Sequence, residues 1–585
     1  MKKVILVAVL ISLTGYGHAV NKINPENCRN IPETQTIDPR AKTGDIVISE
    51  IMADPMPAVS LPEKEYIEIY NRTGFSFDIG NWKLHAGERT ASFPQTGIGP
   101  GEYLILCSQA DTAIFRKYGR VAGLKSFPAL PSGGTSVYIT DGMGLMIHGL
   151  QYSSDWYNNK LKDSGGWSLE IIDTDYPFFE KGNWEASSSK QGGTPGKVNS
   201  ASRYNPDHLF YGIENAFPED SITIYLEFSE YVADLPESGD LVSLGEEKIS
   251  AIISADPLRR RFMIKTNEML RQRTIYELSI SRSLTDFSGN IITRGIFRFG
   301  VPEKAERGDI SFNELLFNPF PDEPDYLELY NCSEKTIDAS QFYLVSINTS
   351  NGDTSDIRYV SDEQRCIIPG SFYAVTTDPN KVLARYFSSD PEAVFWTSSL
   401  PSMPNDKGHI LLLNREMDLI DEVSYSEKMH YSLLSDNEGV SLEKIRPCMV
   451  SDESMNWHSA SESAGWGTPG AENSGFSSGS ASGEQVIFSS GRISPDNDGY
   501  EDLLVIDFRL EGIGNIISVD IFDETGLYVR KITENYLAGA EASLVWDATS
   551  DDGSLVKTGI YIVLIRLYND KGKIRTWKKV CTVIR

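Results

Sequence analysis

The sequence predicts an all-β protein made of β-sandwiches in series. Short segments of alternating apolar and polar residues dominate the chain, and Gly, Pro, Asn or Asp bounds each of them, as is typical of strands joined by turns. A long pattern of such segments occurs twice. Each copy contains one short helical candidate, at 108–119 and at 377–387. These three observations favour sandwich or barrel architecture.

The repeated pattern begins at Gly44 and again at Gly308. GDIVISEIMADPMP returns as GDISFNELLFNPFP, and KEYIEIYN, ending at Asn71, returns as PDYLELYN, ending at Asn331. IGPGEYLIL, GWSLEIID and GGTPGKVNS then return in order as IIPGSFYAV, GVSLEKIR and GWGTPGAENS. The offset between copies drifts along the chain, so loops changed length while strand-like segments stayed. One domain has therefore been duplicated.

The predicted strands of each copy follow this pattern. They are 46–52, 65–71, 103–108, 136–141 and 168–173 in the first copy, and 310–317, 326–331, 372–377, 409–414 and 441–445 in the second. Within 65–71, Ile67 and Ile69 share one face while Tyr66 and Glu68 share the other. Asn71 lies where the strand must turn, and its side chain can bond to nearby backbone.

Two further β units accompany the copies. Residues 203–302 contain ITIYLEFSEYV, a hairpin around 249–266 and TIYELSISRSLTDFSGN, which again predict a sandwich. GFSSGSASGEQ is a flexible linker. Beyond it, 486–585 has alternating segments with turns at 523–526, 550–553 and 569–572.

The N-terminus predicts export. Lys2 and Lys3 precede the apolar run VILVAVLISL and the small-residue exit at Gly17-His18-Ala19, so we expect a secretory signal with a mature chain from about Val20. The run is shorter than the ~20 residues that a bilayer core needs. We expect no transmembrane span in the mature protein.

The net charge bears on the binding partners, and the cysteines bear on disulfide bonding. The formal net charge of −28 would repel a nucleic-acid backbone and favours a solvated, dispersed surface. The second copy has gained Cys332 and Cys366, where the first has Arg72 and Gly97. We predict a disulfide between Cys332 and Cys366, with two buried free thiols as the alternative.

The duplicated unit resembles the lamin-tail domain, an Ig-like β-sandwich of nuclear lamins and of exported bacterial proteins. The resemblance rests on SEIM with Asp54-Pro55, EYIEIYN, GNWKL, PGEY and GTPG in the first copy, and on NELL with Asn318-Pro319, DYLELYN, Pro369-Gly370 and GTPG in the second. It implies tandem Ig-like β-sandwiches with an exported scaffold role and no particular reaction.

The other two units carry resemblances of their own. Phe228-Ser229-Glu230-Tyr231-Val232 and the segment Tyr276–Asn290 resemble the bacterial Ig-like domain of the SbsA type. Residues 494–499, SPDNDG, with Trp546-Asp547 and TGIY at 558–561, resemble the flagellar hook-capping Ig-like domain and the C-terminal domains of Bacteroidetes exported proteins. That resemblance implies a type IX secretion signal, and a plain terminal Ig-like module is the alternative interpretation.

These observations give the following predicted organisation. The chain is divided into a signal peptide (1–19), an N-terminal leader (20–43), lamin-tail domain 1 (44–200), an SbsA-type Ig-like domain (201–303), lamin-tail domain 2 (304–474), a Gly/Ser linker (475–485) and a C-terminal Ig-like, type IX sorting domain (486–585).

Both copies share acidic positions, which are Glu50, Glu65 and Glu68 in the first and Glu314, Asp325 and Glu328 in the second. Carboxylates can act as acid and base or hold a metal. Glu65 and Glu68, however, are three apart on a strand and project to opposite faces. Hydrogen-bonded or solvated strand carboxylates are the favoured interpretation. No phosphate loop, nucleophile elbow or metal-binding His pattern is present, so we predict a protein that is not an enzyme.

One acidic turn predicts a ligand. In DNDGYED, Asp496, Asp498 and Asp502 place oxygen ligands at alternating positions around a glycine, which suits Ca²⁺. We predict a weak, structural calcium site there, with an Asx-rich turn that satisfies itself as the alternative.

The functional prediction is an exported surface or extracellular scaffold or adhesion protein of a Bacteroidetes-like cell envelope, with periplasm or outer membrane as the alternative location. Its expected partners are envelope or extracellular proteins or glycans and the type IX secretion machinery, and we expect no nucleic acid. The alternatives are the accessory region of a secreted hydrolase, acting on nucleic acid or glycan, and a carbohydrate-binding protein. The latter needs a row of exposed aromatic rings.

Overall fold

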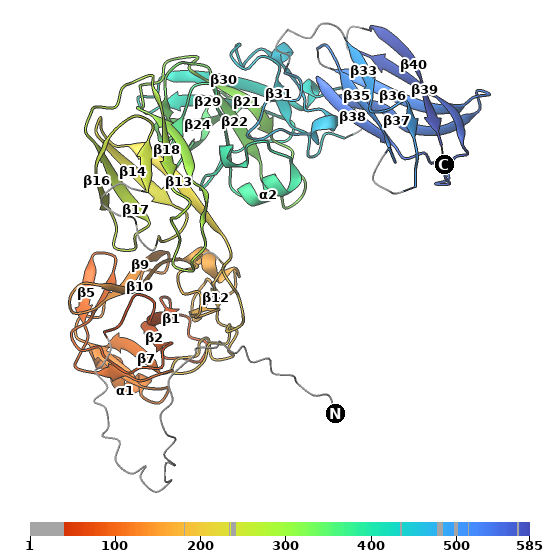
Figure 1. Ribbon diagram of the computed structural model, residues 1–585. Coiled ribbons are helices and arrows are strands. Elements are labelled where there is room, and N and C mark those ends of the chain that lie inside the picture. The colour runs from red at the N-terminus through yellow and green to blue at the C-terminus, as the bar shows by residue number, and fades with distance from the viewer. Residues whose placement is uncertain are drawn as a thin grey trace, which may run out of the picture. The chain divides into compact units, whose positions relative to one another are not determined.

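The computed structural model describes residues 40–585, with gaps at 181, 233–234, 236–240, 433, 435, 477–483, 497–500, 513, 570–571 and 585. The predicted signal peptide, most of the leader and most of the linker lie outside the described residues. Strands form nearly all of the regular structure, which confirms the all-β prediction (Figure 1). The chain divides into two compact units, Met1–Pro206 and Asp207–Arg585.

The first unit is a β-sandwich. Its six-stranded sheet has the order β12-β11-β1-β2-β7-β8, and its four-stranded sheet has the order β10-β9-β4-β5. The elements of this unit are β1 (Ile46–Met52), β2 (Tyr66–Asn71), β3 (Phe77–Asp78), β4 (Lys83–Ala86), β5 (Arg89–Ser92), β6 (Gly97–Ile98), β7 (Tyr103–Ser108), η2 (Gln109–Asp111), α1 (Thr112–Phe115), β8 (Val121–Leu124), β9 (Gly134–Thr140), β10 (Met146–Ser153), η3 (Ser154–Tyr157), β11 (Leu169–Ile171) and β12 (Trp184–Ala186).

Both faces of the six-stranded sheet are covered. Ile67 and Ile69 pack in the core between the two sheets, as their shared face predicts. On the opposite face, Tyr66 packs with Phe115 of α1, with 5.3 Å between ring centroids. Strand β2 is therefore buried along almost its whole length, and any polar side chain on it must find a partner inside the protein.

The second copy repeats this topology strand for strand. Its sheets have the orders β28-β27-β22-β21-β31-β32 and β25-β24-β29-β30, and β23-β26 matches β3-β6. Its elements are β21 (Ile310–Leu316), β22 (Tyr326–Asn331), β23 (Ile337–Asp338), η4 (Ala339–Gln341), β24 (Phe342–Ile347), β25 (Thr354–Tyr359), β26 (Cys366–Ile367), β27 (Phe372–Thr376), α2 (Pro379–Arg385), η5 (Pro391–Ala393), β28 (Val394–Trp396), β29 (Lys407–Asn414), β30 (Leu419–Ser426), η6 (Glu427–Met429), β31 (Leu442–Lys444), η7 (Ser454–Asn456), β32 (Trp457–Ser459) and η8 (Glu462–Ala464). The duplication and the helical candidate of each copy are confirmed.

The predicted turn at the end of the second strand is also confirmed in both copies. Asn71 Nδ2 donates to the carbonyl oxygens of Phe75 and Gly99, and Asn71 Oδ1 accepts from the Thr73 N–H. Asn331 makes the matching contacts with Lys335, Ile367 and Ser333. One buried amide therefore fixes the same loop twice.

Two further β-sandwiches complete the described chain, and we call them the central unit (about residues 203–302) and the terminal unit (residues 486–585). The central sheets, β16-β17-β14-β13-β19 and β15-β18-β20, consist of β13 (Phe210–Pro218), β14 (Thr223–Phe228), β15 (Val242–Leu244), β16 (Ile249–Ser254), β17 (Arg261–Thr266), β18 (Ile275–Ile280), β19 (Ile292–Arg294) and β20 (Ile296–Gly300). The terminal sheets, β33-β35-β38 and β34-β40-β39-β36-β37, consist of β33 (Gln485–Phe488), β34 (Arg492–Ile493), β35 (Leu504–Arg509), β36 (Asn515–Asp523), β37 (Tyr528–Ala538), β38 (Glu541–Trp546), β39 (Gly559–Tyr568) and β40 (Ile574–Val583). Each pair encloses its own apolar core.

The predicted disulfide between Cys332 and Cys366 is wrong. Cys332 is bonded to Cys448, with 5.6 Å between their Cα atoms. Cys366 is a free thiol in the short strand β26, where it packs against the core of the central unit and its Sγ lies 3.5 Å from the Gly300 carbonyl oxygen. Cys332 instead follows the end of β22, beside the segment that follows β31.

The first copy carries an ion pair where the second carries this disulfide. Glu68 matches Glu328, which places Arg72 at the position of Cys332, and Glu170 matches Glu443, which places Asp175 at the position of Cys448. Arg72 Nη2 and Asp175 Oδ1 lie 3.5 Å apart on the surface. An exposed ion pair contributes about 0–1 kcal/mol, so the second copy has replaced a weak link by a covalent one.

Removing the disulfide should destabilise the second copy. The bond closes a loop with a sequence separation of 116 residues, for which chain entropy suggests about 3–5 kcal/mol. We expect the double variant Cys332→Ser/Cys448→Ser to lower the free energy of unfolding by this amount in denaturant titrations. Cys366→Ser is the matched control and should leave the bond intact. Non-reduced peptide mapping that found Cys366 in a disulfide-linked peptide would contradict the assignment.

Candidate functional site

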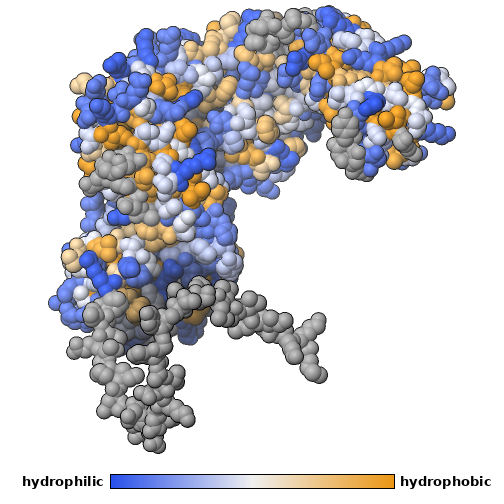
Figure 2. Space-filling model, in the orientation of Figure 1, coloured by the Kyte–Doolittle hydropathy of each residue, from blue (hydrophilic) through white to orange (hydrophobic). Residues whose placement is uncertain are grey.

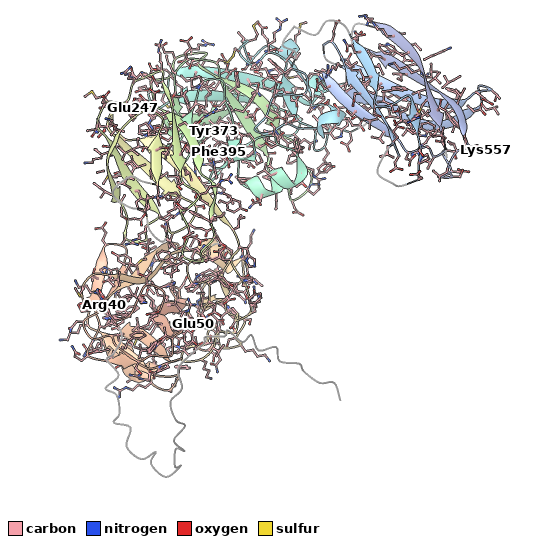
Figure 3. The ribbon with its side chains drawn as sticks, in the orientation of Figure 1. Arg40, Glu50, Glu247, Tyr373, Phe395 and Lys557 are labelled. Atoms are coloured by element: carbon pink, nitrogen blue, oxygen red, sulfur yellow. A yellow bond between two sulfur atoms is a disulfide. The ribbon has the colours of Figure 1, made fainter. Side chains whose placement is uncertain are left out.

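A row of three buried glutamates crosses neighbouring strands in each copy. We call it the glutamate row: Glu50, Glu68 and Glu170 in the first copy, and Glu314, Glu328 and Glu443 in the second. Glu50 of β1 lies opposite both Glu68 of β2 and Glu170 of β11 in the strand register. Glu314 has the same two neighbours, Glu328 and Glu443. All six side chains are 0–3% exposed, and Figure 3 shows Glu50 among the strands of the first unit.

A β-bulge in the first strand of each copy helps to build the row. The register shifts between Ile48 and Glu50, and again between Phe312 and Glu314. The extra residue carries a short polar side chain that donates to the second glutamate: the Ser49 hydroxyl to Glu68 Oε1 at 3.1 Å, and Asn313 Nδ2 to Glu328 Oε1 at 2.7 Å. The bulge therefore aims one more donor at the row.

The Gly-Thr-Pro-Gly segment, at 193–196 and 467–470, covers the row, and we call it the cap segment. In the first copy the Thr194 N–H donates to Glu50 Oε1 at 2.7 Å, the Thr194 hydroxyl to Glu170 Oε1 at 2.8 Å, and the Gly196 N–H to Glu68 Oε2. One four-residue segment thus contacts all three strands.

The second cap segment makes the same three bonds. The Thr468 N–H donates to Glu314 at 2.9 Å, its hydroxyl to Glu443 at 2.8 Å, and the Gly470 N–H to Glu328 at 2.5 Å. The first glutamate of each row also accepts from a tyrosine and a serine hydroxyl. These donors are Tyr66 and Ser168 for Glu50, at 2.7 and 2.6 Å, and Tyr326 and Ser441 for Glu314, at 2.8 and 2.5 Å.

Burial raises the pKa of Glu50, Glu68, Glu314, Glu328 and Glu443. Burial, and next the charge of Glu170, raise the pKa of Glu50 to about 7. Burial, and next the charge of Glu314, raise the pKa of Glu443 to about 8. The pKa values of Glu68 and Glu328 also lie well above their ordinary range, chiefly because burial disfavours the charged form. The hydrogen bonds from the cap segment act in the opposite direction without cancelling burial.

The row is organised for folding. Its oxygens are enclosed, and, apart from the buried Glu50 Oε2, which has no hydrogen-bond partner among the described residues, they accept bonds from the backbone, amide and hydroxyl groups that close the domain. In the described part of the chain, the one group of three possible metal-ligand atoms within 4.8 Å of one another lies elsewhere, at Asp207, Glu230 and Asp286. The interpretation as hydrogen-bonded strand carboxylates therefore agrees with the contacts of Glu50, Glu68, Glu314 and Glu328.

The other two shared acidic residues lie outside the row. Glu65 precedes β2 and is partly exposed. Asp325 lines an open depression of about 530 Å³ with Thr377 and residues 398–405, and burial raises its pKa to about 6. The third member of each row, Glu170 or Glu443, was missing from the predicted set. Its signal was present, because Ser-Leu-Glu recurs in both copies.

The second copy also buries a polar cluster that the sequence did not suggest. Lys444 Nζ donates to the hydroxyls of Ser311 and Ser451, at 2.5 and 2.6 Å, and Ser451 donates to Asp421. Burial lowers the pKa of Lys444 to about 8. A lysine beside a serine can activate a nucleophile, but here both serines are buried. The residues of the first copy that match Ser311, Lys444 and Ser451 are apolar, namely Val47, Ile171 and Phe178. Asp421 is matched by the buried His148, which likewise accepts an N–H of the first strand. The cluster is therefore a variation of the core.

The predicted calcium turn is described only in part. Asp498 lies outside the described residues. Asp496 and Asp502 do approach each other, since the Asp496 N–H donates to Asp502 Oδ1 at 3.1 Å. The calcium site at this turn stays a prediction.

The glutamate row should make stability depend on pH. Because the folded-state pKa values of Glu50, Glu68, Glu314, Glu328 and Glu443 are raised, the folded state holds protons that the unfolded chain releases above about pH 4.5. The stabilisation that these protonated carboxyl groups give the folded state is complete below about pH 4.5, and it is lost as the pH rises through about 7 to 8. We expect the free energy of unfolding to fall from pH 5 to pH 9, by up to about 1.4 kcal/mol per pH unit for each proton held.

Glu68→Gln and Glu328→Gln should each flatten the pH dependence of the free energy of unfolding, because the glutamine amide does not titrate. The variants should still fold, because the amide oxygen can accept the cap N–H. Glu63→Gln, at an exposed position of the first copy, is the control and should keep the slope of the unaltered protein. Thermal unfolding followed across this pH range measures the effect. Equal slopes for Glu68→Gln and Glu63→Gln would contradict the assignment.

The cap segment should be intolerant of a side chain at its second glycine. Gly196 has φ +79°, and an added Cβ would overlap the Tyr118 carbonyl oxygen. We expect Gly196→Ala to cost about 2–5 kcal/mol from backbone strain plus overlap. Gly101 has φ +65° with no atom within 4 Å of such a Cβ, so Gly101→Ala should cost only about 1–2 kcal/mol. Equal losses in denaturant titrations would argue against a tightly held cap segment.

Comparison with known proteins identifies two regions of the chain. The lamin tail domain family matches residues 39–154, and the CHU_C Type IX secretion signal domain matches residues 487–580. Among curated proteins, no relative matches the chain.

Similar solved structures include two Porphyromonas gingivalis proteins and an S-layer protein. Dimeric latent PorU is 10% identical over 76% of this chain and 40% of its own, with a TM-score of 0.14. PorZ, a bacterial surface component of the type-IX secretion system, is 12% identical over 86% and 75%, with a TM-score of 0.16. The S-layer protein rSbsC(31-844) is 10% identical over 64% and 54%, with a TM-score of 0.13. TM-scores of this size carry no functional argument. The chain is a β-rich protein with a lamin tail domain at 39–154 and a type IX secretion signal domain at 487–580.

Proposed function

We propose that this protein is an exported scaffold at the bacterial cell surface or outside the cell. Four β-sandwich modules in series present their loops, and the last module directs the chain through the type IX secretion system. The expected partners are proteins or glycans of the cell envelope or its surroundings. A role in adhesion is the finer form of this proposal.

The observation that carries the proposal is that the side chains shared by the two copies make contacts within their own domain. Four side chains are kept in both copies at the second strand: Tyr66, Glu68, Tyr70 and Asn71, with their matches Tyr326, Glu328, Tyr330 and Asn331. All are buried except Tyr70 and Tyr330, which are half-buried. Tyr66 donates to Glu50, Glu68 accepts from the bulge residue Ser49 and from the cap segment, and Asn71 donates to the loop of its own domain. Selection on the duplicated unit has thus kept a shape, which is what a structural module requires.

The surface is compatible with a dispersed exported protein. On the face shown in Figure 2, hydrophilic residues predominate and hydrophobic ones form small separate groups. The chain carries a net charge of −28, which favours solubility. No helix in the described residues is long and apolar enough to cross a membrane.

Aromatic exposure favours the scaffold over a carbohydrate-binding protein. All nine tryptophans lie in the described residues, and Trp396 alone is largely exposed, at 58%. Trp82, Trp184, Trp457 and Trp546 are buried in cores. A sugar-binding face needs several rings in one plane, and one exposed tryptophan does not supply it. The accessory region of a secreted hydrolase is the remaining alternative.

The C-terminal domain should be necessary for surface delivery. We expect cells that produce a chain lacking 486–585 to retain it in the periplasm, while the full chain reaches the surface or medium. Fractionation with protease accessibility on intact cells measures this. A chain lacking 201–303 instead is the matched control, because it loses a module of similar size and keeps the terminal domain. Surface display of the 486–585 deletion at the level of the full chain would contradict the sorting role.

A further inference from the structure

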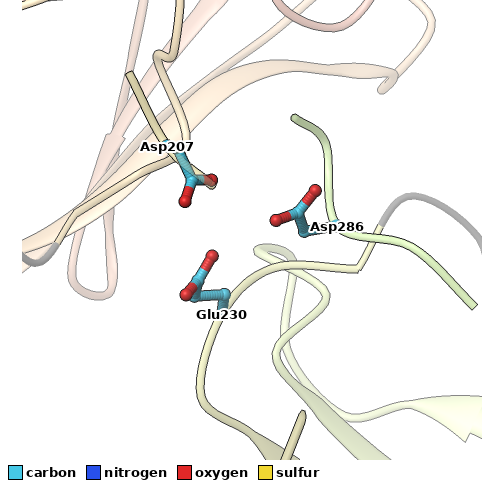
Figure 4. A group of neighbouring side chains, drawn as sticks. All are labelled: Asp207, Glu230 and Asp286. Carbon is cyan, nitrogen blue, oxygen red and sulfur yellow. The ribbon is translucent and has the colours of Figure 1, made fainter. Parts of the chain in front are cut away.

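Three carboxylates converge at one end of the central sandwich. Asp207 lies just before β13, Glu230 just after β14, and Asp286 in the loop between β18 and β19. A β-bridge between Val232 and Asp286 brings the last two segments together. One carboxylate oxygen from each of the three lies within 4.8 Å of the other two. Figure 4 shows the three side chains turned toward a common space.

Asp207 supplies the observation that points to a ligand. The side chain is only 4% exposed, and its Oδ1 accepts the Leu209 N–H at 3.2 Å. Its Oδ2 is buried and has no hydrogen-bond partner among the described residues. A buried carboxylate oxygen without a partner is unfavourable unless a proton or a cation meets it. The orphaned oxygen belongs to the residue that faces Glu230 and Asp286 (Figure 4).

Hydrogen bonds from Asn290 hold the Asp286 side chain in position. The Asn290 N–H and side-chain amide donate to its two oxygens at 2.8 and 2.9 Å. Each oxygen has a second lone pair that these bonds leave available. Burial raises the pKa of Asp286, and the negative charge of Asp207 raises it further. The charge of Asp207 therefore disfavours the charge of Asp286, and a cation between them would reverse this effect.

We propose that Asp207, Glu230 and Asp286 bind one Ca²⁺ in the central sandwich. The Ca–O distance is about 2.4 Å, so oxygens on opposite sides of one ion are about 4.8 Å apart and adjacent ones are closer. The observed separations fit a single ion. Three carboxylates are hard ligands suited to Ca²⁺ or Mg²⁺. Calcium tolerates irregular shells of six to eight oxygens, whereas magnesium demands a near-ideal octahedron, and this site draws on three separate segments.

The ion ties the entry of β13 to the two loops that Glu230 and Asp286 occupy. The test is hydrogen exchange followed by mass spectrometry on the full mature chain, in chelator and with CaCl₂ or MgCl₂. With free calcium at ten times the dissociation constant, opening that releases the ion is suppressed about tenfold. We therefore expect exchange in peptides covering 207–232 and 282–292 to slow about tenfold with calcium and less with magnesium. Unchanged exchange overturns the site, and equal protection by magnesium overturns its assignment to calcium.

Variants make the test specific. Asp207→Asn should abolish the calcium response and raise the melting temperature in chelator, because it removes one of three crowded charges. Glu230→Gln is the second variant and should also abolish the response. Glu277→Gln, which removes an exposed ion pair with Arg298 in the same sandwich, should respond like the unaltered chain, as should Asp502→Asn in the terminal unit. A full response in both Asp207→Asn and Glu230→Gln would overturn the proposal.

Discussion

The structure of each duplicated domain depends on burying three carboxyl groups under a four-residue cap. The cap segment lies more than 100 residues beyond the first strand, yet its N–H and hydroxyl groups bond to glutamates of β1, β2 and β11, or β21, β22 and β31. Without these glutamates, the cap donors and the hydroxyls of Tyr66 and Ser168 would be buried unsatisfied, at about 1–3 kcal/mol each. The row therefore joins the end of the domain to its beginning, at the cost of holding protons inside the sheet.

The two copies show which features the fold requires and which it can exchange. The row, the bulge and the asparagine turn are kept. The link after the second strand has changed from the Arg72–Asp175 ion pair to the Cys332–Cys448 disulfide. An apolar part of the core at Val47 and Ile171 has become the Lys444 cluster with Ser311 and Ser451. In both cases the alternative contacts join residues that are far apart in sequence.

Local patterns predicted the local structure well. Alternation gave the strands of both copies, and Asn71 was expected to bond to the loop it closes. Long-range partners were harder, because the sequence does not state which strands become neighbours. Glu170 meets Glu50 only through the register of β1 and β11, and Cys448 meets Cys332 only through the sheet order. Glu230 and Asp286 were recognised as motif residues, whereas Asp207, whose buried Oδ2 has no hydrogen-bond partner among the described residues, lies outside both motif segments.

The central claim is that Glu68 and Glu328, the second glutamates of the two rows, are protonated structural groups. Infrared spectroscopy of the folded chain, through the carbonyl stretch of protonated carboxyl groups, tests it most directly. At pH 6 the account predicts a band from protonated carboxyls in a dry environment, weaker in the double variant Glu68→Gln/Glu328→Gln and lost on unfolding at the same pH. Absence of that band while the protein is folded would show ionised rows and contradict the account.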